Sequence, residues 1–256
     1  MLTTSVAVST CEWHAELQKA HAIQQHLLDK RDSRPVAHVD SRAVCRQAQA
    51  VGGDFYDLLR LPNGELGVAI ADVAGKGLGA AILAANLQAT LGTEARRAPS
   101  DLVNVISSVN HRFHEASFEE SYATLFYATF SPASRILKYV NAGHNPPLLR
   151  RADGSIEWLE TGGAPVGMFH SSPYGVGSLR LNPGDVLVAY TDGIVEAQDA
   201  LAEQWGARRL VEVVDESRDE MAAQINARIW KAVDRFVGRA DQRDDMTLLV
   251  LRVTRI

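Results

Sequence analysis

Four aspartate-containing segments have the composition expected of a site that holds divalent cations. In each segment an aspartate borders an apolar run typical of a buried strand. The segments are GGDFYD (52–57), VAIADVAGKG (68–77), LVAYTDG (187–193) and RDDMTLLV (243–250). Carboxylates gathered at the edge of a core lose hydration and repel one another. Because only Lys76 and Arg243 add positive charge inside these segments, bound cations are the simplest compensation.

Each aspartate taken alone also fits an ordinary structural role. Asp192 precedes a glycine, as turn residues often do, and Asp54 could cap a backbone amide. Asp244 and Asp245 could form a solvated turn before a strand. The occurrence of four such sites in one chain favours a shared metal centre instead.

The ligand types indicate which metal such a centre would hold. Carboxylate oxygens suit the hard ions Mg²⁺, Mn²⁺ and Ca²⁺. His111 and His114 lie three residues apart without a partner carboxylate motif, so we interpret them as one face of a helix. Two ions bridged by a carboxylate lower the pKa of a shared water and neutralise phosphoryl oxygens during hydrolysis. No GxSxG motif is present, and neither Cys11 nor Cys45 lies in an activating context.

A glycine-rich segment, residues 75–81, directly follows the second acidic site and opens a predicted helix. It lacks the Ser or Thr that follows the lysine of a Walker A phosphate loop. Close packing of helix on sheet, which Gly79, Ala80 and Ala81 would permit, explains the segment better than nucleotide binding. Its position after Asp72 would also allow it to control that residue.

Strands and helices are expected at positions that would bring the acidic segments together. Alternating or continuous apolar runs predict strands over residues 54–61, 66–72, 123–130, 136–141, 185–191 and 246–253. Apolar spacing of three and four predicts helices over residues 12–30, 78–96, 101–116, 207–216 and 218–237. Hairpins are expected across residues 62–64 and 131–134. Hairpin connections favour an α+β fold of stacked antiparallel sheets flanked by helices.

The first predicted helix differs from the others because it precedes the strand-rich region. Trp13, Leu17, Ala20, Ile23 and Leu27 share one face, and the polar run that ends at Pro35 closes the segment. We therefore expect two parts: residues 1–35 as an N-terminal linker or interaction helix and residues 36–256 as the main domain. The helix could pair with a second copy in a homodimer or pack on its own domain.

Composition excludes several classes of protein. The 256 residues, 46% of them hydrophobic, suffice for one large core. A formal net charge of −5 argues against a nucleic-acid partner. The N-terminus lacks a signal-peptide pattern, no apolar run is long enough to span a membrane, and neither cysteine belongs to a CxxC pair. These features predict a cytoplasmic protein with reduced thiols and no membrane association.

The motifs, taken in order, resemble a known family. GGDFYD, ADVAGKGLGAA, YVNAGHNPP, GAPVGM, LNPGDVLVAYTDGIVEA and DDMTLLVL resemble the bacterial metal-dependent serine phosphatases of the SpoIIE and RsbU type, within the protein phosphatase 2C (PPM) superfamily. The resemblance covers residues 36–254. It implies a four-layer α-β-β-α sandwich with two Mn²⁺ or Mg²⁺ ions at one end of the sheets. The segment IQQHLL (23–28) resembles the linker helix that joins such phosphatases to sensor domains.

The resemblance also implies a role for individual residues. Asp72 corresponds to the bridging metal ligand, and the carbonyl of Val73 assists it. Asp54, Asp192 and Asp244 correspond to further catalytic metal ligands. The positions expected to support the ligands or to form a regulatory switch are Asp245, Gly75, Gly77 and Gly79.

Two departures from the superfamily pattern concern acid catalysis and phosphate binding. Ala74 stands where the wider superfamily often has a histidine that could act as general acid. The arginine that binds substrate phosphate near the N-terminus has no counterpart that we can assign. His144 and Asn145 are candidate substitutes, but they also fit a structural turn before Pro146, and we favour that interpretation.

The resemblance implies hydrolysis of phosphoserine or phosphothreonine on a regulatory protein. The expected substrate is an anti-sigma-factor antagonist of the STAS type in a partner-switching pathway. A nucleotide cyclase, hinted at by Gly52-Gly53-Asp54, would leave the later aspartates without a role. A non-catalytic regulatory binding module on a phosphatase scaffold is the alternative, although every expected ligand aspartate is present.

Overall fold

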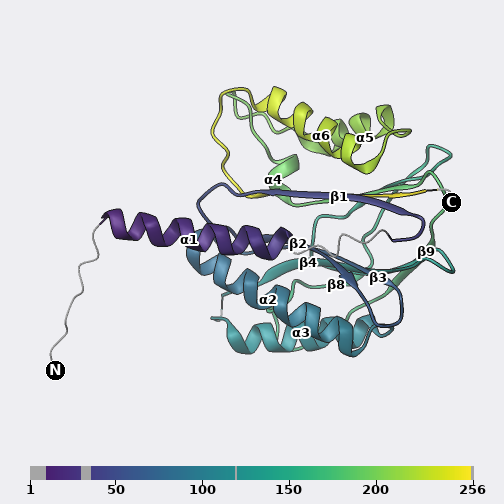
Figure 1. Ribbon diagram of the computed structural model, residues 1–256, viewed down its shortest axis with the longest axis horizontal. Coiled ribbons are helices and arrows are strands. Elements are labelled where there is room, and N and C mark those ends of the chain that lie inside the picture. Colours follow the sequence, from purple (N-terminus) through teal and green to yellow (C-terminus); the bar gives the residue numbers. More distant parts are fainter. Residues whose placement is uncertain (1–9, 30–35, 119, 255–256) are drawn as a thin grey trace.

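The computed structural model describes residues 10–29, 36–118 and 120–254. Two β-sheets pack face to face, and helices cover the outer face of each, which gives the four layers visible in Figure 1. The predicted α-β-β-α sandwich is therefore confirmed. Within the described residues, we find no helix with the combination of length and apolar character that spanning a bilayer would require.

The first sheet, sheet A, has five strands in the order β1-β11-β10-β6-β7. Its strands are β1 (Val39–Arg46), β11 (Met246–Val253), β10 (Val186–Tyr190), β6 (Leu148–Arg150) and β7 (Ile156–Trp158). All pairs are antiparallel. β10 and β11 lie inside the sheet and are covered on both faces, which explains why their sequences are almost continuously apolar.

The second sheet, sheet B, is built around two hairpins that match the predicted turns. Its strands are β2 (Asp54–Arg60), β3 (Leu66–Val73), β4 (Ala123–Ser131), β5 (Ile136–Ala142), β8 (Gly162–Gly163) and β9 (Gly177–Arg180). The order is β2-β3-β4-β5-β8, and β9 pairs with β5. The expectation of antiparallel sheets holds except for the short parallel pair of β5 with β8.

Two pairs of long helices form the outer layers. α2 (Gly77–Arg97) and α3 (Leu102–Ala116) cover sheet B, while α4 (Asp192–Val195), α5 (Gly206–Glu216) and α6 (Ala222–Val237) lie over sheet A. The carboxylate of Asp101 accepts a hydrogen bond from the backbone N–H of Asn104 at 3.1 Å and so caps the N-terminus of α3. One apolar core lies between the sheets and under α2 and α3, and a second lies under α5 and α6.

The N-terminal helix α1 (Thr10–Asp29) lies beside α2 and β2 and extends away from the sandwich in Figure 1. Leu28 belongs to the core, but Trp13 and Ile23 are 51% and 63% exposed. The apolar face of this helix that we identified in the sequence is therefore only partly buried. The side of α1 that packs against the domain is centred on Gln24 and Leu28 instead. The predicted helix end at residues 30–35 lies outside the described residues.

Candidate metal centre

The four acidic segments meet at one end of the sandwich. Asp54 begins β2 and lies directly opposite Asp72 of β3 in the strand register, so the two side chains share one face of sheet B. Asp192 follows β10 and Asp244 precedes β11. Because β10 and β11 are antiparallel neighbours, both residues lie at the same edge of sheet A. Each sheet therefore contributes two of the four predicted ligands.

Asp54 is the most deeply buried of the four. Its carboxylate is 1% exposed and accepts hydrogen bonds at Oδ2 from the hydroxyls of Thr191 and Thr247, each at 2.7 Å. Burial, followed by the charge of Asp72, raises the pKa of Asp54 well above its usual range. Thr247 lies in β11 of sheet A and Thr191 directly follows β10, so Asp54 of sheet B is tied across the interior to the opposite sheet.

Asp72 and Asp192 also carry perturbed carboxyl groups. Burial raises the pKa of Asp72 to about 7, and the charges of Asp192 and Asp244 add to this shift. Burial and then the charge of Asp244 raise the pKa of Asp192. These mutual effects require the carboxylates to lie near one another, and they show that the group disfavours full ionisation in the absence of added positive charge.

Asp244 has a cation beside it within the chain. Lys76, in the loop between β3 and α2, donates from Nζ to Oδ2 of Asp244 at 2.8 Å and to the carbonyl oxygen of Arg243 at 2.7 Å. Both side chains of the pair are about half exposed. The charge of Lys76 also lowers the pKa values of Asp72 and Asp192 against the larger shifts that raise them. Lys76 therefore places an ammonium group in direct contact with one carboxylate of the acidic cluster.

Asp245 supports the loop before β2. Its Oδ1 accepts from the backbone N–H of Ala48 and its Oδ2 from that of Gly53, both at 2.8 Å. A Cβ added at Gly52 would lie 1.8 Å from Oδ2 of Asp245, and one added at Gly193 would lie 2.0 Å from the carbonyl oxygen of the same residue. Only glycine therefore allows these two segments to approach Asp245 so closely. This arrangement fits the expected supporting position of Asp245.

Val73, the predicted carbonyl ligand, is buried at the end of β3. Its N–H donates to the carbonyl oxygen of Gly53 at 3.3 Å. A Cβ at Gly53 would lie 2.6 Å from the carbonyl oxygen of Val73, so the backbones of the first and second acidic segments touch there.

The glycine-rich segment has two residues that need their backbone freedom. Gly75 and Gly77 have φ values of +105° and +73°, in the region that favours glycine. Gly79 is exposed, and a Cβ there would meet nothing within 4 Å. The interpretation of Gly79 as a helix–sheet packing residue is therefore wrong, although Ala80 and Ala81 are buried as expected.

Gln24 connects α1 to the first acidic segment, and nothing in the amino-acid sequence marks it beyond its place in a predicted helix. Its Nε2 donates to the carbonyl oxygen of Gly52 at 2.7 Å, and its Oε1 accepts from the N–H of Gly52 at 3.1 Å. His21 lies within 2.7 Å of the carbonyl oxygen of Ala50 through Nδ1. Thr191 and Thr247 were likewise not predicted, although each lies within one of the four acidic segments of the sequence.

The histidines outside the cluster have structural contacts. His144 is 5% exposed, and its Nδ1 lies 2.8 Å from Oγ1 of Thr124, the residue opposite Asp72 on β4. Burial lowers the pKa of His144 to about 4. His114 is 2.9 Å from the carbonyl oxygen of Gly167 through Nδ1. Cys45 is a free thiol whose pKa is raised by burial, while the side chain of Cys11 lies outside the described residues.

The donor set fits a hard divalent cation, but the ligands do not form a closed cage. Among the described residues, no three His, Cys, Asp or Glu side chains already enclose a single point where an ion would bind. The side chains that converge are nevertheless carboxylates. Burial and, after it, their mutual repulsion raise the pKa values of Asp54, Asp72 and Asp192, and a bound cation would oppose both effects. Oxygen ligands of this kind are those that Mg²⁺ and Mn²⁺ prefer.

Known proteins share this sequence pattern and this fold. The chain is 27% identical to protein IcfG of Synechocystis over 92% of its own length and 28% identical to the phosphoserine phosphatase RsbU of Bacillus subtilis over 94%. It spans 41% of the length of IcfG and 71% of RsbU. The SiaA-PP2C domain of Pseudomonas aeruginosa has the same fold, with a TM-score of 0.84 at 18% identity over 96% of this chain and 99% of that domain.

The family model for stage II sporulation protein E (SpoIIE) matches residues 62–254. This match covers three of the four acidic segments and most of both sheets. It confirms the resemblance drawn from the motifs, and the chain belongs to the SpoIIE family.

Proposed function

We propose that the chain is a metal-dependent protein phosphatase that hydrolyses phosphoserine or phosphothreonine on a regulatory protein. The observation that carries the proposal is the convergence of Asp54, Asp72, Asp192 and Asp244 at one end of the two sheets. The pKa values of the first three carboxyl groups are raised, chiefly by burial. The name of the relative RsbU, a phosphoserine phosphatase, supports the same reaction.

In this proposal the four carboxylates hold two Mn²⁺ or Mg²⁺ ions, and the carbonyl of Val73 assists. When bound, the ions supply Lewis acidity toward phosphoryl oxygens and lower the pKa of a water molecule. Asp72 lies opposite Asp54 and is influenced by Asp192 and Asp244, which suits it to bridge the two halves of the site. Asp245 acts as a positioning residue because its carboxylate is already engaged by two backbone N–H groups.

The structure around the acidic cluster supports a role for the loop that contains Lys76. Gly75 and Gly77 let the chain turn sharply after β3, and the side chain of Lys76 between them contacts Asp244. A change in the start of α2 would therefore move a positive charge relative to the carboxylates. We propose that Gly75, Gly77 and Gly79 belong to a regulatory switch at this position.

We further propose a phosphorylated STAS-type anti-sigma-factor antagonist as substrate and the cytoplasm as the place of action. Residues 36–256 would form the phosphatase domain and residues 1–35 an interaction segment. The exposure of Trp13 and Ile23 on α1 supports contact of that helix with a second copy of the chain. Sedimentation of the parent and of a Trp13→Ala, Ile23→Ala double variant tests this: equal masses would contradict self-association through α1.

The activity is tested with p-nitrophenyl phosphate and Mn²⁺ on the full chain. Asp72→Asn and Asp192→Asn should abolish metal-dependent hydrolysis, because each removes a carboxylate from the cluster. Asp153→Asn is the matched control, since this fully exposed aspartate lies in the turn between β6 and β7. Equal activity in the parent and in Asp72→Asn would refute the site, and an inactive parent would favour the binding-module alternative. Mass spectrometry of a phosphorylated STAS protein incubated with the chain tests the substrate.

A further inference from the structure

An arginine-lined cavity lies at the end of sheet A opposite the metal centre. Its volume is about 660 Å³. β11 begins at Met246 beside the acidic cluster and ends at Val253, which lines this cavity. Three arginines, Arg150, Arg218 and Arg252, contribute to the wall, and Asp219 is its one carboxylate among the lining residues described. The net charge of the lining is thus positive in a chain whose net charge is −5.

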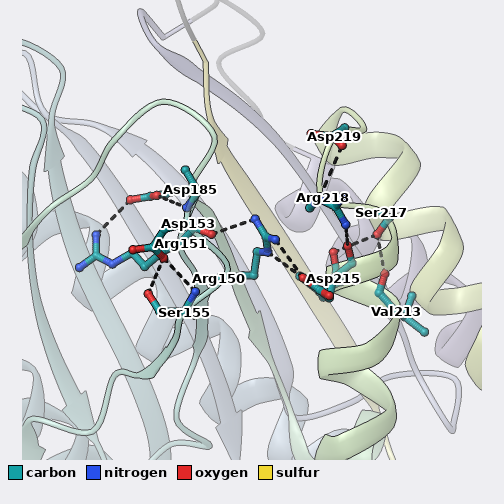
Figure 2. Close-up of polar contacts among 12 residues, drawn as sticks. Arg150, Arg151, Asp153, Ser155, Asp185, Val213, Asp215, Ser217, Arg218 and Asp219 are labelled. Atoms are coloured by element: carbon teal, nitrogen blue, oxygen red, sulfur yellow. Dashed lines mark hydrogen bonds and ion pairs between the residues drawn. The ribbon is translucent and has the colours of Figure 1, made fainter.

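Arg150 forms a fixed part of the wall. Its side chain is 7% exposed, and Nε and Nη2 donate to Oδ1 of Asp215 at 3.1 and 2.9 Å. Nη1 donates to the carbonyl oxygen of Arg151 at 2.8 Å. Figure 2 shows the fork of Arg150 directed at Asp215, while Arg151 turns the other way to Asp185. Arg150 is therefore held in place and its charge is neutralised by a carboxylate outside the lining.

Arg218 and Arg252 have much weaker partners. Nε of Arg218 is 3.7 Å from Oδ2 of Asp219, beyond hydrogen-bond distance, and the side chain of Asp219 is 90% exposed. Nη1 of Arg218 donates to the backbone carbonyl oxygen of Asp215 at 3.2 Å, so one of its N–H groups has a neutral acceptor. Nη1 of Arg252 approaches the sulfur of Met221 at 3.7 Å, and a thioether is a poor acceptor. Nε of Arg252 is buried, and no acceptor in the described part of the chain bonds to it. Two guanidinium groups therefore retain donor capacity at this cavity.

Two carboxylates on the chain segments near Arg252 are already engaged. Asp40 of β1 lies opposite Arg252 in the strand register, but its Oδ2 accepts from the N–H of Ala222 at the start of α6, at 2.6 Å. Asp185, behind the turn that lines the cavity, is bound by the side chain of Arg151 at 3.0 Å and by the N–H of Ala152 at 2.8 Å. Among the described residues, neither Asp40 nor Asp185 forms an ion pair of 4 Å or less with Arg218 or Arg252.

These features define the chemistry of a matching ligand. Guanidinium groups bind phosphate and carboxylate oxygens through paired N–H donors, and two of them match the double charge of a phosphomonoester near neutral pH. The volume lies in the range of small-molecule sites. Pro183, Met221 and Val253 add apolar surface for the organic part of such a molecule.

We propose that this cavity binds a small organic phosphomonoester, with Arg218 and Arg252 sharing its phosphate group. The site is separate from the proposed phosphatase centre, since β10 and β11 run their full length between the two. Binding here therefore requires neither the acidic cluster nor its metal ions.

Isothermal titration of the full chain, kept in EDTA, tests the site with phenyl phosphate as the probe. Saturable binding is expected for phenyl phosphate and none for phenol, because the arginines recognise the phosphate. Arg218→Ala and Arg252→Ala should each raise the dissociation constant by at least about 10-fold. Arg252→Lys keeps a charge and an apolar stem, so it should lose less affinity than Arg252→Ala. Retained binding in Arg252→Lys would exclude misfolding as the cause of the loss in Arg252→Ala.

Two control variants complete the experiment. Arg208→Ala removes an arginine that is 75% exposed on α5 and paired with Glu212, so it should leave binding unchanged. Asp72→Asn should also bind phenyl phosphate as the parent does. The proposal is overturned by the absence of saturable binding at millimolar probe, by equal weakening in Arg208→Ala, or by loss of binding in Asp72→Asn.

Discussion

Replacing Lys76 by methionine should tighten Mn²⁺ binding, because the ammonium group of Lys76 pairs with Oδ2 of Asp244 and so competes with a metal ion for that carboxylate. The ion pair is 2.8 Å long, which corresponds to about 1.5 kcal/mol in a medium like water. Its side chains are 49% and 48% exposed, so solvent screening and side-chain entropy reduce the value to ~0.2–1 kcal/mol. The expected gain in affinity is therefore about 1.4-fold to 5-fold.

Isothermal titration of Mn²⁺ into EDTA-treated and dialysed protein measures this change. Lys76→Arg is the matched control, since it keeps the positive charge and should bind Mn²⁺ nearly as the parent does. The metal-free methionine variant should also unfold at a lower urea concentration, because the carboxylates lose their neighbouring cation. Weaker Mn²⁺ binding in Lys76→Met would refute the reasoning, since it would mean that the lysine assists the metal rather than competing with it.

Three further predictions concern the supports of the site and one buried acid. Gly193→Ala places a Cβ 2.0 Å from a backbone carbonyl oxygen, so urea unfolding should show a loss of at least ~2 kcal/mol; an unchanged midpoint would contradict the close approach. Burial raises the pKa of the Asp57 carboxyl from 3.8 to about 6 in the folded protein. The folded state therefore keeps this proton at pH values where the unfolded state has lost it, and the free energy of unfolding falls as the pH rises from about 4 to about 6. Asp57→Asn should therefore gain up to ~3 kcal/mol over the parent above pH ~6 and nothing below pH ~4, measured by urea unfolding; a gain that is the same at both pH values would rule this out. Gln24→Ala removes two hydrogen bonds to Gly52 and should weaken Mn²⁺ binding in the titration described above, whereas equal affinity would show that α1 does not stabilise the first acidic segment.

The strands that carry the site could be predicted closely because their signals are local. The run that predicts a strand over residues 246–253 gives the bounds of β11, and the run over 66–72 gives β3 to within one residue. Both are apolar segments that are bounded in the sequence by turn residues or by charged residues. β1 was missed because VDSRAVCR mixes polar and apolar residues, as an edge strand paired only with β11 can. α4 was missed because four residues are too few to show a helical period.

The site was predictable to the level of its aspartates but not of their partners. Each aspartate borders a recognisable strand, and the strand ends meet in one place once the sheets form. The contacts of Asp54 with Thr191 and Thr247, in contrast, join residues 137 and 193 positions apart. No local pattern encodes such pairs. The same is true of Gln24, which looks like any polar residue of an amphipathic helix until its contact with Gly52 is known.

For the metal centre that we propose, the division of the acidic cluster between the two sheets makes the thickness of the sandwich a determinant of metal affinity. Asp54 and Asp72 move with sheet B, whereas Asp192 and Asp244 move with sheet A. Side chains such as Phe126 and Leu249, buried in the core, help to set the gap between them. A larger or smaller residue there changes the spacing of carboxylates that it never touches. In this proposal, substitutions anywhere in the interior can lower metal affinity, and tight metal binding requires that the two sheets keep their normal separation.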